Sequence, residues 1–189
     1  MAMKPGERRL QILQTLAAML ENPRGEKVTT AALAAKLGVS EAALYRHFAS
    51  KAQMFEGLIE FIETTLFSFV NRITAETTDG VAQAEQAVVM LLSFAEKNPG
   101  MTRVLIGEAL VNEDERLQAR INQLVDKLEA ALRQSLRIAQ AANGWHGDAQ
   151  ADAAVLIAYV LGRWQLYAKS GFKRTPQDGW ALQRKFLFG

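Results

Sequence analysis

The chain has 189 residues, of which 49% are hydrophobic and 22% are charged, so we expect a globular protein rather than a disordered one. It has no cysteine, which excludes disulfides and thiol chemistry and is typical of a cytoplasmic protein. The formal net charge of +2 is unevenly divided, because residues 1–51 carry eight bases and four acids whereas the other residues carry 14 bases and 16 acids. A basic N-terminal region is typical of proteins that contact a phosphate backbone.

The first predicted element is a helix over residues 7–22, which Pro23 and Gly25 end. Its expected buried face consists of Leu10, Leu13, Leu16 and Leu20. Arg8 and Arg9 at its start either contact DNA or form a solvated helix end.

A helix-turn-helix is predicted over residues 29–51. Thr29 or Thr30 caps its first helix, Ser40 caps the second, and Gly38 suits the left-handed residue between them. The small apolar core expected for this pair is Leu33, Leu37, Val39, Leu44 and Phe48. This geometry places the second helix in the major groove of DNA.

Spacing alone leaves a second interpretation open, because many all-helical proteins contain a short helical hairpin with a glycine turn. The basic charge of this region favours DNA binding, and Tyr45, Arg46, His47 and Lys51 can reach phosphates and base edges. The two histidines, His47 and His146, lack metal-ligand spacing. No phosphate-binding loop or nucleophile–base pair stands out, so we expect neither an enzyme, nor a metal site, nor a cofactor.

The rest of the chain is predicted to be helical. Ser50 and Gln53 form a capping box that opens a long helix, which we expect to connect the head to the body. The predicted helices are residues 51–76, 81–97, 102–111, 113–141 and 148–170, with a last short helix within 172–189. The two long C-terminal helices suit a dimer interface built as a four-helix bundle. The alternative is that both helices simply form part of the hydrophobic core.

Four side chains lie off the apolar stripes of the two middle helices. With 100° per residue, Phe61 and Phe67 each lie about 120° from the centre of their stripe, on opposite sides of it. Met90 lies about 160° from the centre of its stripe, and Lys97 is about opposite that centre. A lone exposed methionine is usually without function, but Phe61 and Met90 lie on consecutive helices that can form a groove. Such a groove suits a peptide that carries acidic residues better than it suits a small molecule.

The head resembles the TetR family of dimeric DNA-binding regulators. The matching residues are Thr29-Thr30, Leu33-Ala34, Leu37-Gly38-Val39-Ser40, Leu44-Tyr45-Arg46-His47-Phe48 and Ser50-Lys51. The resemblance implies a homodimer on palindromic double-stranded DNA. The DNA-binding residues that it implies are Thr29, Thr30, Ser40, Ala42, Tyr45, Arg46, His47 and Lys51.

Further blocks resemble those members of the family that act in nucleoid occlusion. The blocks are VSEAALYRHF, MFEGLIEFIE, EKNPGMTRVLIGEAL, ERLQARINQL and FKRTP, within the span from Arg8 to Pro176. The resemblance implies a DNA-bound division inhibitor that engages the C-terminal tail of the tubulin-like division protein and blocks ring assembly over the nucleoid. The partner-binding residues that it implies are Phe61, Met90, Lys97 and Asn98. Phe69 departs from the basic residue expected there, and Arg72 lies about 300° further round the helix.

We therefore expect an all-α protein with a helix-turn-helix DNA-binding domain at residues 1–50 and a helical dimerisation and partner-binding domain at residues 51–189. We expect it in the cytoplasm, associated with the nucleoid and not with a membrane. One alternative is a repressor of the same fold that a small-molecule ligand releases from DNA. Its cavity can be lined by Trp145, Trp164 and Trp180, although these residues are more simply interpreted as packing residues. Another is a structural nucleoid protein with little sequence preference.

Overall fold

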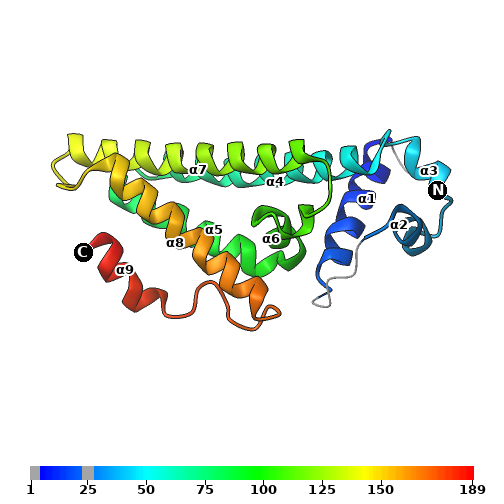
Figure 1. Cartoon of the computed structure of the whole chain (residues 1–189). Coiled ribbons are helices and arrows are strands. Elements are labelled where there is room, and N and C mark those ends of the chain that lie inside the picture. Colours follow the sequence, from blue (N-terminus) through cyan, green and yellow to red (C-terminus); the bar gives the residue numbers. More distant parts are fainter. Residues whose placement is uncertain (1–4, 23–27) are drawn as a thin grey trace. The chain divides into compact units, whose positions relative to one another are not determined.

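The computed structural model describes residues 5–22 and 28–189, and the regular elements in these ranges are all helical (Figure 1). They are α1 (Pro5–Leu20), α2 (Thr30–Leu37), α3 (Glu41–Tyr45), α4 (Lys51–Glu76), α5 (Gly80–Lys97), α6 (Pro99–Leu105), the 3₁₀ turn η1 (Glu108–Leu110), α7 (Glu115–Ala141), α8 (Ala149–Lys169) and α9 (Trp180–Phe188). The predicted all-α fold is confirmed. A search of the described part of the chain finds no helix that is long and apolar enough to span a membrane.

The chain forms two compact units. The first comprises residues 1–62 and 98–121, and the second comprises residues 63–97 and 122–189. The long helices α4 and α7 each contribute to both units, and an ion pair joins them within each: Arg116 with Glu56 in the first and Lys127 with Glu63 in the second. These units do not test the expected division into a DNA-binding domain at residues 1–50 and a dimerisation and partner-binding domain at residues 51–189. That division stays a prediction.

In the first unit, α1 packs against α2 and α6, and α2 packs against α3. Ile12, Leu16, Leu33 and Leu44 are fully buried between these helices. The predicted face of α1 was wrong at Leu10, which is 39% exposed. The burial of the β-branched Ile12 in its place shows that the buried face lies slightly further round the helix.

Helix α6 begins earlier than predicted. Pro99 occupies its first turn, where the missing proline N–H would have no helical partner in any case. The predicted helix over residues 102–111 is interrupted at Gly107, whose φ of 76° is left-handed. The chain therefore forms α6 and then the short turn η1.

In the second unit, α5 packs along α8 (Figure 1). Trp164 of α8 is fully buried, and its indole N–H donates to the carbonyl oxygen of Leu91 at 3.1 Å. The Tyr167 hydroxyl donates to the carbonyl oxygen of Glu96, also at 3.1 Å. Trp164, expected to line a ligand cavity in the repressor alternative, is thus a packing residue that fixes α8 on α5.

Candidate nucleic-acid interface and partner groove

Three local features stabilise the helix-turn-helix at the predicted positions: a left-handed glycine and two helix caps. Gly38 adopts φ 67°, and its N–H donates to the carbonyl oxygen of Ala35 at 3.1 Å, which ends α2. The side-chain oxygens of Thr29 and Ser40 accept the N–H groups of Ala32 and Ala43, at 3.1 and 3.3 Å. These bonds satisfy donors that a helix start leaves unpaired, so the sequence fixes both helix starts locally.

Helix α3, the predicted reading helix, was expected from Ser40 to His47 and is shorter than that. It ends at Tyr45, and Arg46 and His47 follow in a turn. Ala42, Tyr45 and Arg46 are exposed, and Tyr45 retains 45% of its surface. His47 is half-buried, and its carbonyl oxygen accepts a bond from Arg9 Nη1 at 3.1 Å.

Two further polar side chains of the head are engaged within the protein. The Thr30 hydroxyl donates to Glu41 Oε2 at 2.6 Å, which links the first turns of α2 and α3. The guanidinium carbon of Arg9 lies 4.1 Å from the centre of the Phe48 ring, a cation–π contact that anchors α1 on the turn after α3. Arg9, one of the candidate DNA contacts, therefore has a packing role in this structure.

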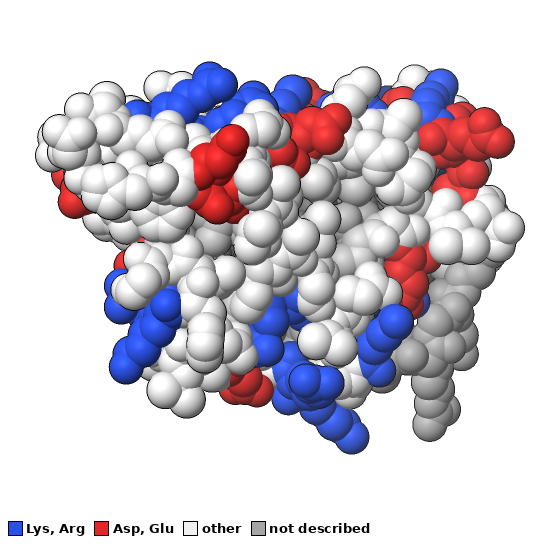
Figure 2. Space-filling model, turned by 60° about the vertical axis from the view of Figure 1, so that its left-hand side comes forward, with Lys and Arg blue, Asp and Glu red and all other residues white. Residues whose placement is uncertain are grey.

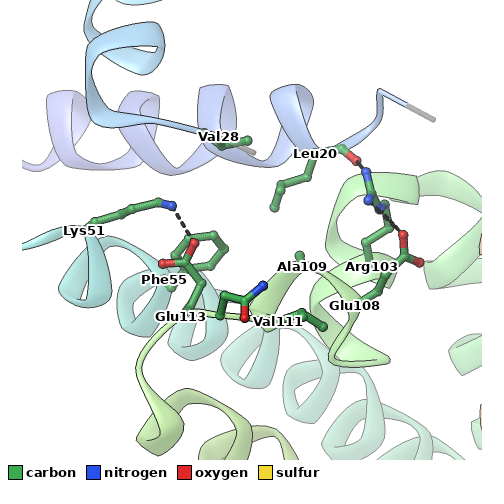
Figure 3. A pocket seen from close by; sticks show the side chains of 10 residues that line it. Leu20, Val28, Lys51, Phe55, Arg103, Glu108, Ala109, Val111 and Glu113 are labelled. Carbon is green, nitrogen blue, oxygen red and sulfur yellow. Dashed lines mark hydrogen bonds and ion pairs between the residues drawn. The ribbon is translucent and has the colours of Figure 1, made fainter. Parts of the chain in front are cut away.

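Lys51, the remaining predicted DNA residue, points into a pocket of the first unit (Figure 3). Its Nζ lies 2.5 Å from Glu113 Oε1, and the two side chains are 23% and 12% exposed. The pocket also holds Arg103, whose Nη1 donates to the carbonyl oxygens of Leu20 and Asn22 at the end of α1. The Lys51 ammonium is thus paired within the protein.

An open groove of about 550 Å³ runs between α4 and α5 in the second unit. Its lining is mostly apolar and consists of Phe69, Arg72, Ile73, Ala82, Glu85, Gln86, Val89, Met90 and Ser93. The guanidinium carbon of Arg72 lies 5.2 Å from the centre of the Phe69 ring. Arg72 thus lines the same groove as Phe69 despite the angular offset between them.

The four predicted partner-binding residues are distributed between the two units. Met90 lines the groove and is half-buried. Lys97 is exposed in the last turn of α5, in the same unit. Phe61 and Asn98 are half-buried and belong to the first unit.

An ion pair that the sequence did not indicate fixes α9 beside the groove. Arg184 Nε and Nη2 donate to the two carboxylate oxygens of Glu85 at 2.7 and 2.6 Å. The hydrogen bonds that Arg184 donates to Glu85, and then the negative charge of that carboxylate, raise the pKa of Arg184 above its usual value. The pair spans 99 residues of sequence, so local patterns carry no signal for it.

The outer face of α8 is apolar and exposed. Its predicted small-residue stripe, Ala151, Ala154, Ala158 and Gly162, is exposed along its full length. Val155 and Leu166 on the same helix are 56% and 39% exposed. Figure 2 shows one face of the molecule, on which uncharged residues, polar and apolar alike, cover much of the surface. On α8 itself the exposed residues named above are apolar. Exposed apolar surface of this kind is typical of an interaction site.

A metal-dependent site has no support in the described ranges, where no group of three or more His, Asp or Glu side chains is placed to hold an ion.

Two family models match the chain. One, described as the bacterial regulatory proteins of the tetR family, matches residues 17–58. The other, described as a tetracyclin repressor-like C-terminal domain of the SlmA-like type, matches residues 78–189. The matches thus include the helix-turn-helix and the helices α5 to α9.

The chain is 50% identical to the nucleoid occlusion factor SlmA of Alteromonas mediterranea over 94% of its own length and 92% of the relative's. It is also 50% identical to SlmA of a Marinomonas species, over 97% and 94% of the two chains. In fold it is similar to the fatty acid degradation regulator FadR of Bacillus halodurans, with a TM-score of 0.82, 14% identity, and coverage of 100% and 97%. The chain therefore belongs to the SlmA family of nucleoid occlusion factors, within the TetR family of DNA-binding regulators.

Proposed function

We propose that the protein is a DNA-addressed inhibitor of cell division. It binds palindromic chromosomal sites as a homodimer, and in the DNA-bound state it engages the C-terminal tail of the tubulin-like division protein and blocks ring assembly over the nucleoid. The observation that carries the proposal is an open groove lined by Met90, in a chain about half identical to nucleoid occlusion factors. In this proposal the protein has no catalytic activity and no cofactor, and it resides with the nucleoid in the cytoplasm.

The DNA contacts come from the exposed part of the head. Tyr45 and Arg46 are exposed at the end of α3 and reach phosphates, while Ala42 lets the helix approach the bases closely. Thr29 and Ser40 lie at the starts of α2 and α3, and a helix start attracts anions such as a phosphate. The remaining contacts come from Thr30, His47 and Lys51. Each of these residues has a hydrogen bond or ion pair within the protein. On DNA, each either replaces that internal interaction with a contact to DNA or keeps it and positions the neighbouring side chains.

The homodimer forms through the exposed apolar face of α8. The small residues of this helix let a second helix approach closely, as four-helix interfaces require. Ala158→Glu is expected to shift the protein to a monomer in analytical ultracentrifugation and to weaken binding to a palindrome more than to a half-site. Ala75→Glu, which places the same charge on an exposed alanine of α4, is the matched control. Retention of the dimer in both variants would exclude this face.

The partner groove takes a peptide with apolar anchors, and Met90 provides the apolar contact. Lys97 supplies a positive charge at the end of α5, in keeping with an acidic tail. Phe61 lies on α4 about two turns before Phe69, and Asn98 follows directly after α5. These two residues belong to the first unit, and their contact with the tail is proposed separately from the groove.

The deciding experiment titrates a labelled C-terminal tail peptide of the division protein into the full-length protein. It is performed with and without a duplex that carries a site selected from a random DNA pool. We expect binding to strengthen with the duplex, and Met90→Ala, Phe61→Ala and Lys97→Glu to weaken it about five-fold or more, as truncation of a central anchor does. Arg137→Glu, a charge reversal on an exposed residue of α7 outside the groove lining, is the control for Lys97. Unchanged binding in all three variants would refute the groove assignment.

A second readout separates the proposal from its alternatives. Ring-forming assembly of the division protein is followed by light scattering, and we expect inhibition only when protein and cognate duplex are both present. Inhibition without a cognate site would favour a structural nucleoid protein. Release of DNA by an apolar ligand, with no effect on assembly, would favour a small-molecule-responsive repressor.

A further inference from the structure

The charges around the α4–α5 groove define which peptide it accepts. We infer that Arg72 receives an acidic side chain of the bound peptide, and that Arg184 of α9 permits this by neutralising Glu85 in the groove wall. The inference rests on the proposed function, because it specifies how the same groove selects its partner. It assigns to α9 a part in partner selection.

The lining supplies the apolar component of the site. Phe69 and Ile73 contribute from α4, and Val89 and Met90 from α5. All four are half-buried, so each retains surface for a ligand while its other side packs in the protein. An apolar peptide side chain in this groove removes water from both partners, which favours binding.

The lining also carries one charge of each sign. Among its described residues, Arg72 is the cation and Glu85 is the anion. Arg72 is exposed, and its guanidinium lies over the face of Phe69 three residues earlier on α4. This cation–π contact orients the planar group and leaves its N–H donors available, and a guanidinium fork matches a carboxylate geometrically.

Glu85 alone would repel the peptide that Arg72 attracts. Its carboxylate is instead held by the guanidinium of Arg184 through two hydrogen bonds of 2.7 and 2.6 Å. The two side chains are 25% and 39% exposed, so solvent only partly screens the pair. With Glu85 neutralised, the net charge that the groove presents is the positive charge of Arg72.

Helix α9 is in turn fixed by contacts that do not involve the groove. The Tyr159 hydroxyl of α8 donates to Gln183 Oε1 at 2.5 Å, next to Arg184 in sequence. The Tyr159 ring also contacts Trp180, with ring centres 6.1 Å apart. These contacts hold Arg184 over Glu85, so the C-terminal helix sets the charge of a groove formed by two other helices.

The test compares two forms of the tail peptide, the natural one and one whose acidic side chains are replaced by the corresponding amides. Both are titrated into the full-length protein with its selected duplex. We expect Arg72→Gln to weaken the natural peptide about two- to five-fold, the range of a partly exposed ion pair, and to leave the amide peptide unchanged. Arg137→Gln, which removes an exposed arginine of α7 outside the groove lining, is the matched control.

A double-mutant cycle tests Arg184. We expect Arg184→Gln to weaken the natural peptide by a similar factor, because it leaves the Glu85 charge unpaired. The double variant Arg184→Gln/Glu85→Gln is expected to regain wild-type affinity, because the groove again presents only Arg72. If the double variant binds as weakly as Arg184→Gln alone, Arg184 acts through the fold of α9 and not through charge, and its assigned role is overturned.

The test distinguishes failure of the partner assignment from failure of the role given to Arg72. Equal binding of the natural and amide peptides by the wild-type protein would overturn the role of Arg72 and leave the partner assignment standing. No binding of either peptide would overturn the partner assignment and this inference with it. Binding of the natural peptide that is stronger than that of the amide form, and sensitive to Arg72, supports both.

Discussion

The pairing of Lys51 with Glu113 predicts that Glu113→Gln strengthens DNA binding. The ammonium and carboxylate are 2.5 Å apart, and both side chains are mostly buried. If Lys51 contacts a phosphate, it must first leave Glu113. Breaking the Lys51–Glu113 ion pair costs free energy, and removing the negative charge of Glu113 lowers this cost. The variant therefore binds cognate DNA more tightly, although its folded state is less stable.

The sizes of the stability loss and the affinity gain in Glu113→Gln follow from the partial burial of the Lys51–Glu113 pair. Exposed ion pairs contribute about 0.2–1 kcal/mol, and breaking a fully buried pair costs about 3–5 kcal/mol. With exposures of 23% and 12%, we expect Glu113→Gln to lower the free energy of unfolding by about 1–3 kcal/mol. If about 1 kcal/mol of the pairing energy opposes DNA binding, its loss raises affinity about five-fold.

The assay measures affinity for a cognate duplex by fluorescence anisotropy over a series of salt concentrations. Glu115→Gln is the control, because it removes an exposed acid from the start of α7 and so corrects for the general loss of a negative charge. Lys51→Gln is expected to reduce the salt slope by about 0.9, the value for one phosphate contact. An unchanged slope, or no gain for Glu113→Gln beyond that of Glu115→Gln, would show that Lys51 stays with Glu113 on DNA.

Three further predictions concern stability. Thr29→Ala removes the cap of α2 and is expected to lower the free energy of unfolding in urea by about 1 kcal/mol. Gly100→Ala is expected to lower it by about 2 kcal/mol or more, measured in the same way, because the added Cβ would overlap the backbone of α1. Asp148 caps α8, and the N–H groups of Ala151 and then Gln150 hold its pKa below the usual 3.8. Its stabilising effect is therefore complete above that value and is lost as pH falls through the depressed pKa, so Asp148→Asn is expected to flatten the acid limb of a pH series of urea midpoints.

The sequence was most informative where short-range hydrogen bonds decide the structure. Thr29, Gly38 and Ser40 were predicted to end and begin the helices of the head, and each does so with a bond to a residue at most four positions away. One of the two bonds of the predicted capping box forms, since Ser50 Oγ accepts the N–H of Gln53 at 3.1 Å. The second bond differs from the prediction, because the Gln53 side chain accepts the N–H of Ala49, one residue before the cap, and not that of Ser50.

The partners of charged side chains could not be predicted in this way. Lys51 pairs with a residue 62 positions later, and Arg184 with one 99 positions earlier. From the sequence alone, any acidic residue was an equally good candidate partner for Lys51 or Arg184, because the two members of an ion pair can lie at any separation along the chain. Choosing between them requires the packing of α7 and α9, which depends on the whole fold.

Angular distance from the apolar stripe predicts only part of the groove. It singles out Met90 on α5, because that side chain lies far from the stripe of its helix. The groove walls also include residues of the stripes themselves: Phe69 and Ile73 belong to the apolar stripe of α4, yet both are half-buried and line the groove. Since these two residues serve both packing and the groove, their substitution changes stability and binding together. Arg72 is exposed and Met90 lies off the core stripe, so their variants separate the two effects.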